Sequence, residues 1–174
     1  MQDEEGLVRE AKRGDQQAFA RLYEANFDKI YRYVTVRIGD KTEAEDMTQQ
    51  VFLNALQSLP SFKWKGVPFS AWLFRIAHNQ VVDYLRRKKR QPVPLPDEVP
   101  LPKENDPQII AERSFAIERL LAAARRLTEA QREVISLRFA GEMPIAEVAR
   151  IMGKSQGAIK ALQHSAIVAL RKTL

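Results

Sequence analysis

An acidic, proline-rich segment at residues 92–107 divides the chain, and it limits more than any other feature what this sequence can fold into. It holds six of the nine prolines in a chain of 174 residues. Proline lacks an amide donor and disfavours helix at the residue before it, so we predict an extended, semi-rigid linker. The parts on either side, residues 1–91 and 108–174, are each long enough to form a small domain.

Charge follows the same division. Residues 1–91 and 108–174 carry net charges of +4 and +5, whereas the linker carries −3 and the whole chain +6. The basic surplus suits a polyanionic partner. For the linker itself, an inert spacer remains the alternative to any role of its acidic charge.

Composition excludes several classes of site. The chain has no cysteine and only two histidines, which rules out a disulfide framework and disfavours a metal site, so no metal or cofactor is expected. No apolar run approaches the roughly 18–20 residues of a membrane span, and the acidic N-terminus lacks the apolar stretch of a signal peptide. We therefore expect a cytoplasmic protein without membrane insertion.

Hydrophobic periodicity predicts an all-α fold: two small helical domains joined by the extended linker, the C-terminal one with a helix-turn-helix. One helix should run from the N-cap Asp15 to Gly39, a second from a capping box at Thr42, and a third from about Phe69 to Lys89. In the second helix the predicted inward residues are Met47, Val51, Phe52, Ala55, Leu56 and Leu59. After the linker, Asp106-Pro107 should start a helix that ends near Arg126, and a capping box at Thr128 should start another that ends at Gly141.

The last thirty residues have the spacing of a helix-turn-helix. Gly153 can supply the turn, and Ile159 and Leu162 can hold the second helix against the first. The residues left facing outward on the second helix are Ser155, Gln156, Lys160, Ala161 and His164, and Lys154 with the free amides after Ser155 could seat a phosphate. A helix mounted in this way can enter the major groove of DNA with its N-terminal turn at the base edges. An ordinary helical hairpin is the alternative, and for Lys160 and His164 singly a solvated face is nearly as good an interpretation.

The first part carries a basic run at Arg86–Arg90 and an aromatic stretch, Phe62-Lys63-Trp64-Lys65. Aromatic rings interleaved with cations are what unstacked bases require, because the rings stack on bases while the charges meet the backbone. The alternatives are a solvated helix end for the basic run and core packing for Phe62.

Three stretches resemble motifs of bacterial sigma factors. Ala44–Leu53 is similar to the helix that binds core RNA polymerase. Phe69–Asn79, continuing through Asp83–Arg87, resembles the segment that opens the promoter −10 element. The part from Leu127 onward resembles the domain that reads the −35 element. Their order, without room for further domains, resembles the extracytoplasmic-function (ECF, group 4) class of the sigma-70 family.

The resemblance implies a promoter-specificity subunit without catalytic residues: region 2 at 1–91, the linker at 92–107 and region 4 at 108–174. Its partners would be the largest and second-largest subunits of core polymerase, promoter DNA and an anti-sigma factor. The residues implied to bind polymerase are Asp46, Gln49, Gln50 and Phe52. Those implied at the −10 element are Phe62, Lys63, Trp64, Lys65, Asn79, Arg86, Arg87 and Lys88. Those implied at the −35 element are Lys154, Ser155, Gln156, Lys160 and His164.

Two other functions remain as alternatives. A stand-alone helix-turn-helix regulator would explain the last domain but leave the other two motifs without a purpose. A nuclease would need clustered carboxylates, and the acidic cluster around Asp46 resembles the polymerase-binding face instead. The chain also departs from the family in one place, because Lys160 is the only cation between residues 159 and 168. Fewer phosphate contacts should weaken −35 binding and flatten its salt dependence.

Overall fold

A computed structural model describes residues 3–63, 67–89, 119 and 121–173, and every regular element among them is helical. The elements are α1 (Glu4–Lys12), α2 (Gln16–Ile38), α3 (Lys41–Ser58), the 3-10 turn η1 (Leu59–Ser61), α4 (Phe69–Lys88), α6 (Glu129–Ile135), the π-helical turn η2 (Ser136–Ala140), α7 (Ile145–Met152) and α8 (Gln156–Thr173). The all-α prediction is confirmed. The linker at 92–107, Asp106-Pro107, Trp64 and Lys65 lie outside the described residues.

Local capping chemistry sets most of the helix ends. The Asp15 carboxylate accepts hydrogen bonds from the first amides of α2, and Gly39 ends that helix in the left-handed conformation at φ 79°, as the sequence predicts. The predicted capping box at Thr42 is wrong. Asp40 is the N-cap of α3, and its carboxylate accepts from the amides of Thr42 and Glu43. Because Asp40 stands two residues before Thr42 and accepts from the free amides at the start of the helix, α3 begins at Lys41.

The second part confirms one capping box and adds a distortion. Thr128 and Gln131 exchange the two reciprocal hydrogen bonds of a capping box at the start of α6. The helix then widens into η2 before it stops at Gly141. Helix α1, capped by Asp3, has no counterpart in the sequence prediction.

Helices α1 to α4 enclose a core that includes Leu22, Ile30, Val51, Leu73 and Phe74. Helix α3 buries Phe52 but leaves two leucines exposed. Phe52 is only 3% exposed and packs its ring against Tyr23, so it lies inside this core as its spacing predicts. Leu56, predicted to face inward, is 47% exposed, as is Leu53 at 49%. The inward stripe of α3 is therefore narrower than the periodicity indicates.

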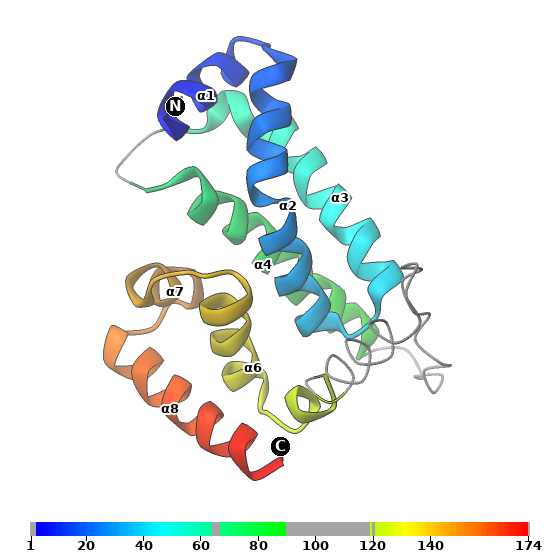
Figure 1. Cartoon of the computed structure of the whole chain (residues 1–174), viewed down its shortest axis with the longest axis vertical. Coiled ribbons are helices and arrows are strands. Elements are labelled where there is room, and N and C mark those ends of the chain that lie inside the picture. Colours follow the sequence, from blue (N-terminus) through cyan, green and yellow to red (C-terminus); the bar gives the residue numbers. More distant parts are fainter. Residues whose placement is uncertain (1–2, 64–66, 90–118, 120, 174) are drawn as a thin grey trace, which may run out of the picture.

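The two parts of the chain pack on one another, which the sequence analysis did not anticipate. Figure 1 shows α6, α7 and α8 together below α4, with α2 reaching down toward α6. Leu137 and Met143 from the second part belong to the same buried cluster as Tyr33 of α2 and Phe74 of α4. Gly141 lies so close to Phe74 that a Cβ atom added there would come within 2.8 Å of its ring.

Candidate nucleic-acid and polymerase interfaces

Helices α7 and α8 form the predicted helix-turn-helix. Gly153 sits between them at φ 64°, a conformation in which a side chain would be strained. The Ser155 hydroxyl accepts from the amide of Ala158 at 3.1 Å and caps α8. Ile159 is fully buried and fixes α8 against the rest of the second part. The second helix is thus held rigidly by a turn and a buried anchor.

The outward face of α8 carries the residues predicted to read DNA. Lys154, Gln156, Lys160 and His164 are all exposed. Ser155 is exposed too, but its hydroxyl oxygen is engaged in the cap, so its contribution to an anion site would come through the amides of the first turn.

The cationic side chains at the end of α4 differ in exposure. Arg86 and Arg87 are exposed on the last turn. Lys88 instead bends back toward α3: its Nζ donates to the Tyr84 hydroxyl at 2.9 Å and lies 3.5 Å from the Glu43 carboxylate. Tyr84 also donates to Glu43, so these three side chains tie the end of α4 to the start of α3.

Phe62, implied by the resemblance to contact a base, lies in the core, as its alternative interpretation expects. It is 5% exposed and packs against Phe69 and Trp72, with ring centroids 5.9 and 5.0 Å away. Its backbone carbonyl accepts from Lys12 Nζ at 2.6 Å. With so little of its ring exposed, Phe62 fits the core-packing alternative of the sequence analysis better than a base contact. Lys63 and Asn79 are exposed.

The exposed face of α3 carries Asp46, Gln49 and Gln50. The Gln49 amide oxygen accepts from the Tyr23 hydroxyl at 3.3 Å, and Gln50 donates to Asn54 at 2.9 Å. Phe52, grouped with them by resemblance, points into the core and cannot form part of this surface. The exposed leucines of α3, which sequence reasoning missed, lie among the polar residues.

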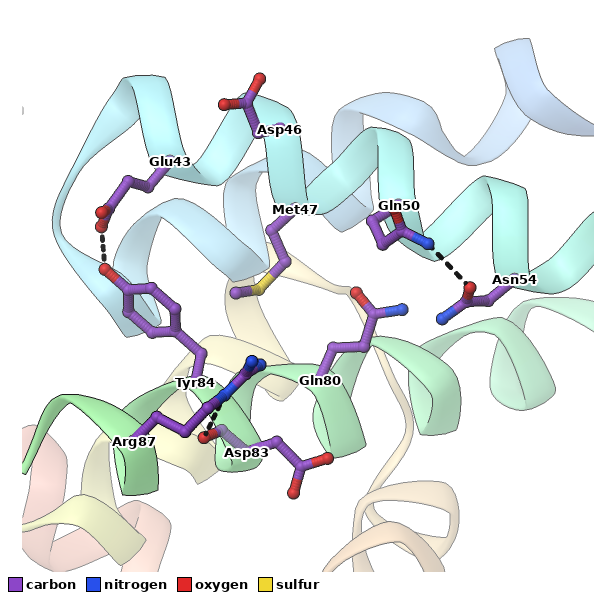
Figure 2. A pocket seen from close by; sticks show the side chains of 9 residues that line it. All are labelled: Glu43, Asp46, Met47, Gln50, Asn54, Gln80, Asp83, Tyr84 and Arg87. Atoms are coloured by element: carbon purple, nitrogen blue, oxygen red, sulfur yellow. Dashed lines mark hydrogen bonds between the residues drawn. The ribbon is translucent and has the colours of Figure 1, made fainter. Parts of the chain in front are cut away.

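A groove of about 490 Å³, lined mostly by polar residues, runs between α3 and α4. Figure 2 shows Met47 at its floor, Asp46 and Gln50 projecting from α3, and Gln80 and Asp83 from α4. The groove adjoins both the α3 face and the basic end of α4. It therefore belongs to the same continuous surface as the candidate contact residues.

One buried charged cluster lies where the two parts of the chain meet. Glu133 of α6 accepts from the Tyr33 hydroxyl and from His78 Nδ1, each at 2.6 Å, and forms an ion pair with Arg37 of α2. The side chains of Arg37 and Glu133 are both 4% exposed. His78 and Glu133 fall within stretches that resemble family motifs, but sequence reasoning assigned none of the four residues a role, because their partners are distant along the chain.

Burial alone would raise the pKa of Glu133. The hydrogen bond from His78 and the positive charge of Arg37 outweigh burial and hold that pKa below its ordinary value. Burial and the negative charge of Glu133 raise the pKa of Tyr33 well above its usual range. At neutral pH the cluster therefore contains a carboxylate and a neutral phenol.

Two parts of the chain match models of known protein families. A family model described as Sigma-70 region 2 matches residues 22–91, and one described as Sigma-70, region 4 matches residues 123–172. These two modules in this order define a sigma factor of the sigma-70 class. The ECF RNA polymerase sigma factor SigW of Bacillus subtilis is 32% identical over 96% of this chain and 94% of its own length. The chain belongs to the ECF sigma factor family.

A further relative supports the same assignment, and two solved structures show a similar fold. The ECF RNA polymerase sigma factor BldN of Streptomyces coelicolor is 39% identical over 97% of this chain, which spans 64% of the length of BldN. The structure of CnrH in complex with the cytosolic domain of CnrY aligns at a TM-score of 0.72 and 25% identity, covering 95% of this chain and 93% of CnrH. RpoE of Bartonella quintana, solved with the anti-sigma factor NepR, shares the fold at a TM-score of 0.75 and 22% identity, covering 90% of this chain and 96% of RpoE.

The described residues hold neither a membrane-spanning helix nor a metal cluster. Within those ranges, no helix has the length and apolarity to cross a membrane. In the same part of the chain, no group of three or more histidine, aspartate or glutamate side chains could hold a metal ion.

Proposed function

We propose that this protein binds core RNA polymerase through α3, melts the promoter −10 element with α4, and reads the −35 element with α8. The division into region 2 at residues 1–91, a linker at 92–107 and region 4 at 108–174 belongs to this proposal. A stand-alone operator-binding regulator is not favoured, because it has no use for a sigma-70 region 2 at residues 22–91.

One observation carries the proposal: the outward face of α8, the second helix of the helix-turn-helix, is exposed to solvent. The chain that carries this helix belongs to the sigma-70 family. Gln156 and Lys160 project from the first turns of α8, while Ile159 between them is fully buried. Glutamine can pair with adenine through two hydrogen bonds, and lysine can reach guanine or a phosphate. A rigid helix with these side chains free is suited to a major groove.

At the −10 element, the proposed contacts are Lys63, Asn79, Arg86 and Arg87. All four are exposed, and the two arginines extend the cationic end of α4 toward a DNA backbone. Trp64 and Lys65, outside the described residues, remain proposed contacts on sequence grounds. Lys88 also has a structural role, because its ammonium binds Tyr84 and Glu43 and so ties the end of α4 to the start of α3.

For polymerase, the proposed surface is the exposed polar face of α3 with Asp46, Gln49 and Gln50. Leu53 and Leu56 add apolar area that the chain itself leaves uncovered. A mixed face of carboxylate, amides and leucine is typical of a protein interface with a polar rim and an apolar centre. This surface replaces the one that included Phe52.

The remaining partners and the setting are also proposals. The relatives are named sigma factors, which are not enzymes, so we infer that this chain contributes recognition and polymerase contributes the chemistry. Such a protein works where the bacterial chromosome is, in the cytoplasm. An anti-sigma factor is the expected regulator, and the likeness to CnrH, solved in complex with the cytosolic domain of CnrY, favours a protein partner of this kind.

Transcription in vitro with core polymerase on a genomic library tests the proposal, with start sites mapped for the parent and two variants. R86A/R87A removes two exposed arginines from α4. R9A/R13A removes the same charge from α1 and its C-cap and is the matched control. We expect R86A/R87A to bind core polymerase normally but to reduce open complexes at least tenfold, and the control to match the parent. New start sites that are absent with core polymerase alone support the function, and their absence refutes it.

The −35 assignment has its own test. K160A should weaken binding to the mapped −35 sequence and reduce the slope of log affinity against log salt by about 0.9, the value for one phosphate contact. K172A, which removes a lysine from the far end of the same helix, is the control. An unchanged slope for K160A would show that Lys160 meets no phosphate.

A further inference from the structure

We propose that Arg138 is a positioning residue that determines which base pairs α8 can read. Its guanidinium fixes the rotation of α8 about its own axis, and so directs Gln156 and Lys160 at particular base edges. Arg138 acts through α8 and does not itself touch DNA. The inference rests on the proposed function, because it concerns the −35 contact.

Arg138 joins both helices of the helix-turn-helix to η2. Its Nε donates to the amide oxygen of Gln163, in the middle of α8, at 2.8 Å. Its Nη1 donates to the carbonyl oxygen of Met143 at 2.7 Å. Met143 directly precedes Pro144, the N-cap of α7. Because a guanidinium is planar and rigid, one side chain holds the approach to the first helix and the middle of the second in a single arrangement.

The π-helical turn η2 presents Arg138 to α8. In this turn the amide of Gly141 donates to the carbonyl oxygen of Ser136, five residues back, at 2.9 Å. Arg138 is half-buried against its two acceptors, while the neighbouring Phe139 is 55% exposed. Turns of this kind are rare and frequently occur at functional sites. The distortion therefore fits a role beyond simple packing.

Hydrogen bonds hold α8 on both sides of its buried stripe. Ile159 and Ala166, which form the stripe, are fully buried. At about 100° per residue, Gln163 lies about 50° to one side of the stripe and Ser165 about 110° to the other. Ser165 accepts from Gln131 Nε2 of α6 at 3.1 Å, so the bonds to Gln163 and Ser165 oppose rotation in both directions. Apolar contact alone is not directional and would resist small rotations weakly.

A small rotation affects base readout more than phosphate contact. An α-helix with its side chains is about 10–12 Å across, so a rotation of about 20° moves its outer surface by about 2 Å. Hydrogen bonds to base edges need donor–acceptor distances of about 2.7–3.2 Å, and such a movement breaks them. The flexible Lys160 can still reach a phosphate. Loss of Arg138 should therefore reduce sequence preference more than overall affinity.

The test uses holoenzyme assembled with core polymerase, on a promoter library in which the mapped −35 sequence is randomised and the −10 element is constant. Sequence preference is the ratio of transcript from the favoured −35 sequences to transcript from the random ones. R138Q removes the guanidinium, and Q163M removes its acceptor on α8 without changing any charge. We expect both to lower the preference at least about fivefold, the loss of about one base contact. The slope of log affinity against log salt should stay parental.

Two further variants serve as rescue and control. Q163E keeps an acceptor for Arg138, so it should retain the parental preference and the same favoured sequence. R171Q removes an exposed arginine from the far end of α8 and should also retain the parental preference.

Three results overturn the proposal. One is a loss in R138Q that is uniform across sequences with a salt slope lower by about 0.9, because Arg138 would then be a phosphate contact. Another is parental preference in both R138Q and Q163M. The third is a new favoured sequence in Q163E, because Gln163 would then read a base itself. Circular dichroism checks folding, and Q163M decides the question if R138Q loses helix.

A measurement without polymerase separates this role from the proposed function. The chain has no cysteine, so R125C/A161C gives two exposed sites for nitroxide labels. We expect the distribution of distances between the labels to shift or widen by about 2 Å in R138Q and Q163M, and to stay parental in R171Q. An unchanged distribution overturns the positioning role. A parent that never supports initiation refutes the proposed function instead, and the label distances alone then decide the role of Arg138.

Discussion

The sequence leaves two interpretations of Phe62, a base-contacting ring and a core residue, and F62A distinguishes them. The ring is 5% exposed and lies against two other aromatic rings. Truncating a buried phenylalanine costs about 3–5 kcal/mol, and the site borders a small groove with α1, which favours the lower end. We therefore expect F62A to lower the free energy of unfolding by about 3 kcal/mol.

Thermal unfolding followed by circular dichroism measures this cost. For a chain of this size, each kcal/mol shifts Tm by about 2–4 °C, so F62A should melt about 6–12 °C below the parent. K63A is the matched control: the adjacent side chain is exposed, and its loss should stay within about 0.5 kcal/mol. The reasoning fails if F62A has the same Tm as K63A and yet cannot open promoter DNA. The ring would then be a base contact without a structural role.

Two further predictions concern titration and backbone strain. The pKa of Glu133 is lowered in the folded chain, so the stability that its carboxylate contributes is complete above the ordinary carboxylate value of about 4.3 and is lost as pH falls through the lowered pKa. The difference in Tm between the parent and E133Q should therefore stay constant from pH 7 to 5 and shrink only in more acidic solution, as measured by circular dichroism. G153A should cost about 1 kcal/mol and weaken −35 binding, because Gly153 has a φ of 64°. G157A, within α8 where a Cβ meets only open space and the edge of Ser155, should instead stabilise by about 0.5–1 kcal/mol. Equal effects of the two glycine substitutions on Tm would contradict the strain argument.

Local signals predicted the secondary structure well. Asp15, Gly39 and Gly153 act within one helical turn of themselves, so the helix ends they set are confirmed without knowledge of the rest of the fold. The prediction that Thr42 caps α3 was wrong for an equally local reason, since Asp40 stands two residues earlier and is an equally good cap. Short-range chemistry can be predicted when one residue has no competitor.

Side-chain direction was harder to predict. Leu56 matches an apolar stripe but is exposed, and Phe62 matches a nucleic-acid motif but is buried. Both outcomes depend on what lies opposite in space: α1 supplies Lys12 for the carbonyl of Phe62, and α1 was not predicted at all. Exposure of a single aromatic or leucine is a property of the packed structure.

The contact between the modules could not be predicted from local pattern. Tyr33 and Glu133 are 100 positions apart, and His78 and Glu133 are 55 apart. A tyrosine or glutamate in an amphipathic helix is most often at the surface, and nothing nearby in the sequence marks these as buried. Long-range pairs of this kind appear only when the helices are placed together.

The division of labour within α8 has an evolutionary consequence. Ile159 and Ala166 attach the helix from its inner side, while Gln156, Lys160 and His164 lie in solvent and contribute little to folding. Substitutions at the outer positions are therefore nearly free of thermodynamic penalty. Duplicated copies of such a gene can drift toward new target sequences without first acquiring compensating mutations, so one scaffold can give rise to many regulatory programmes.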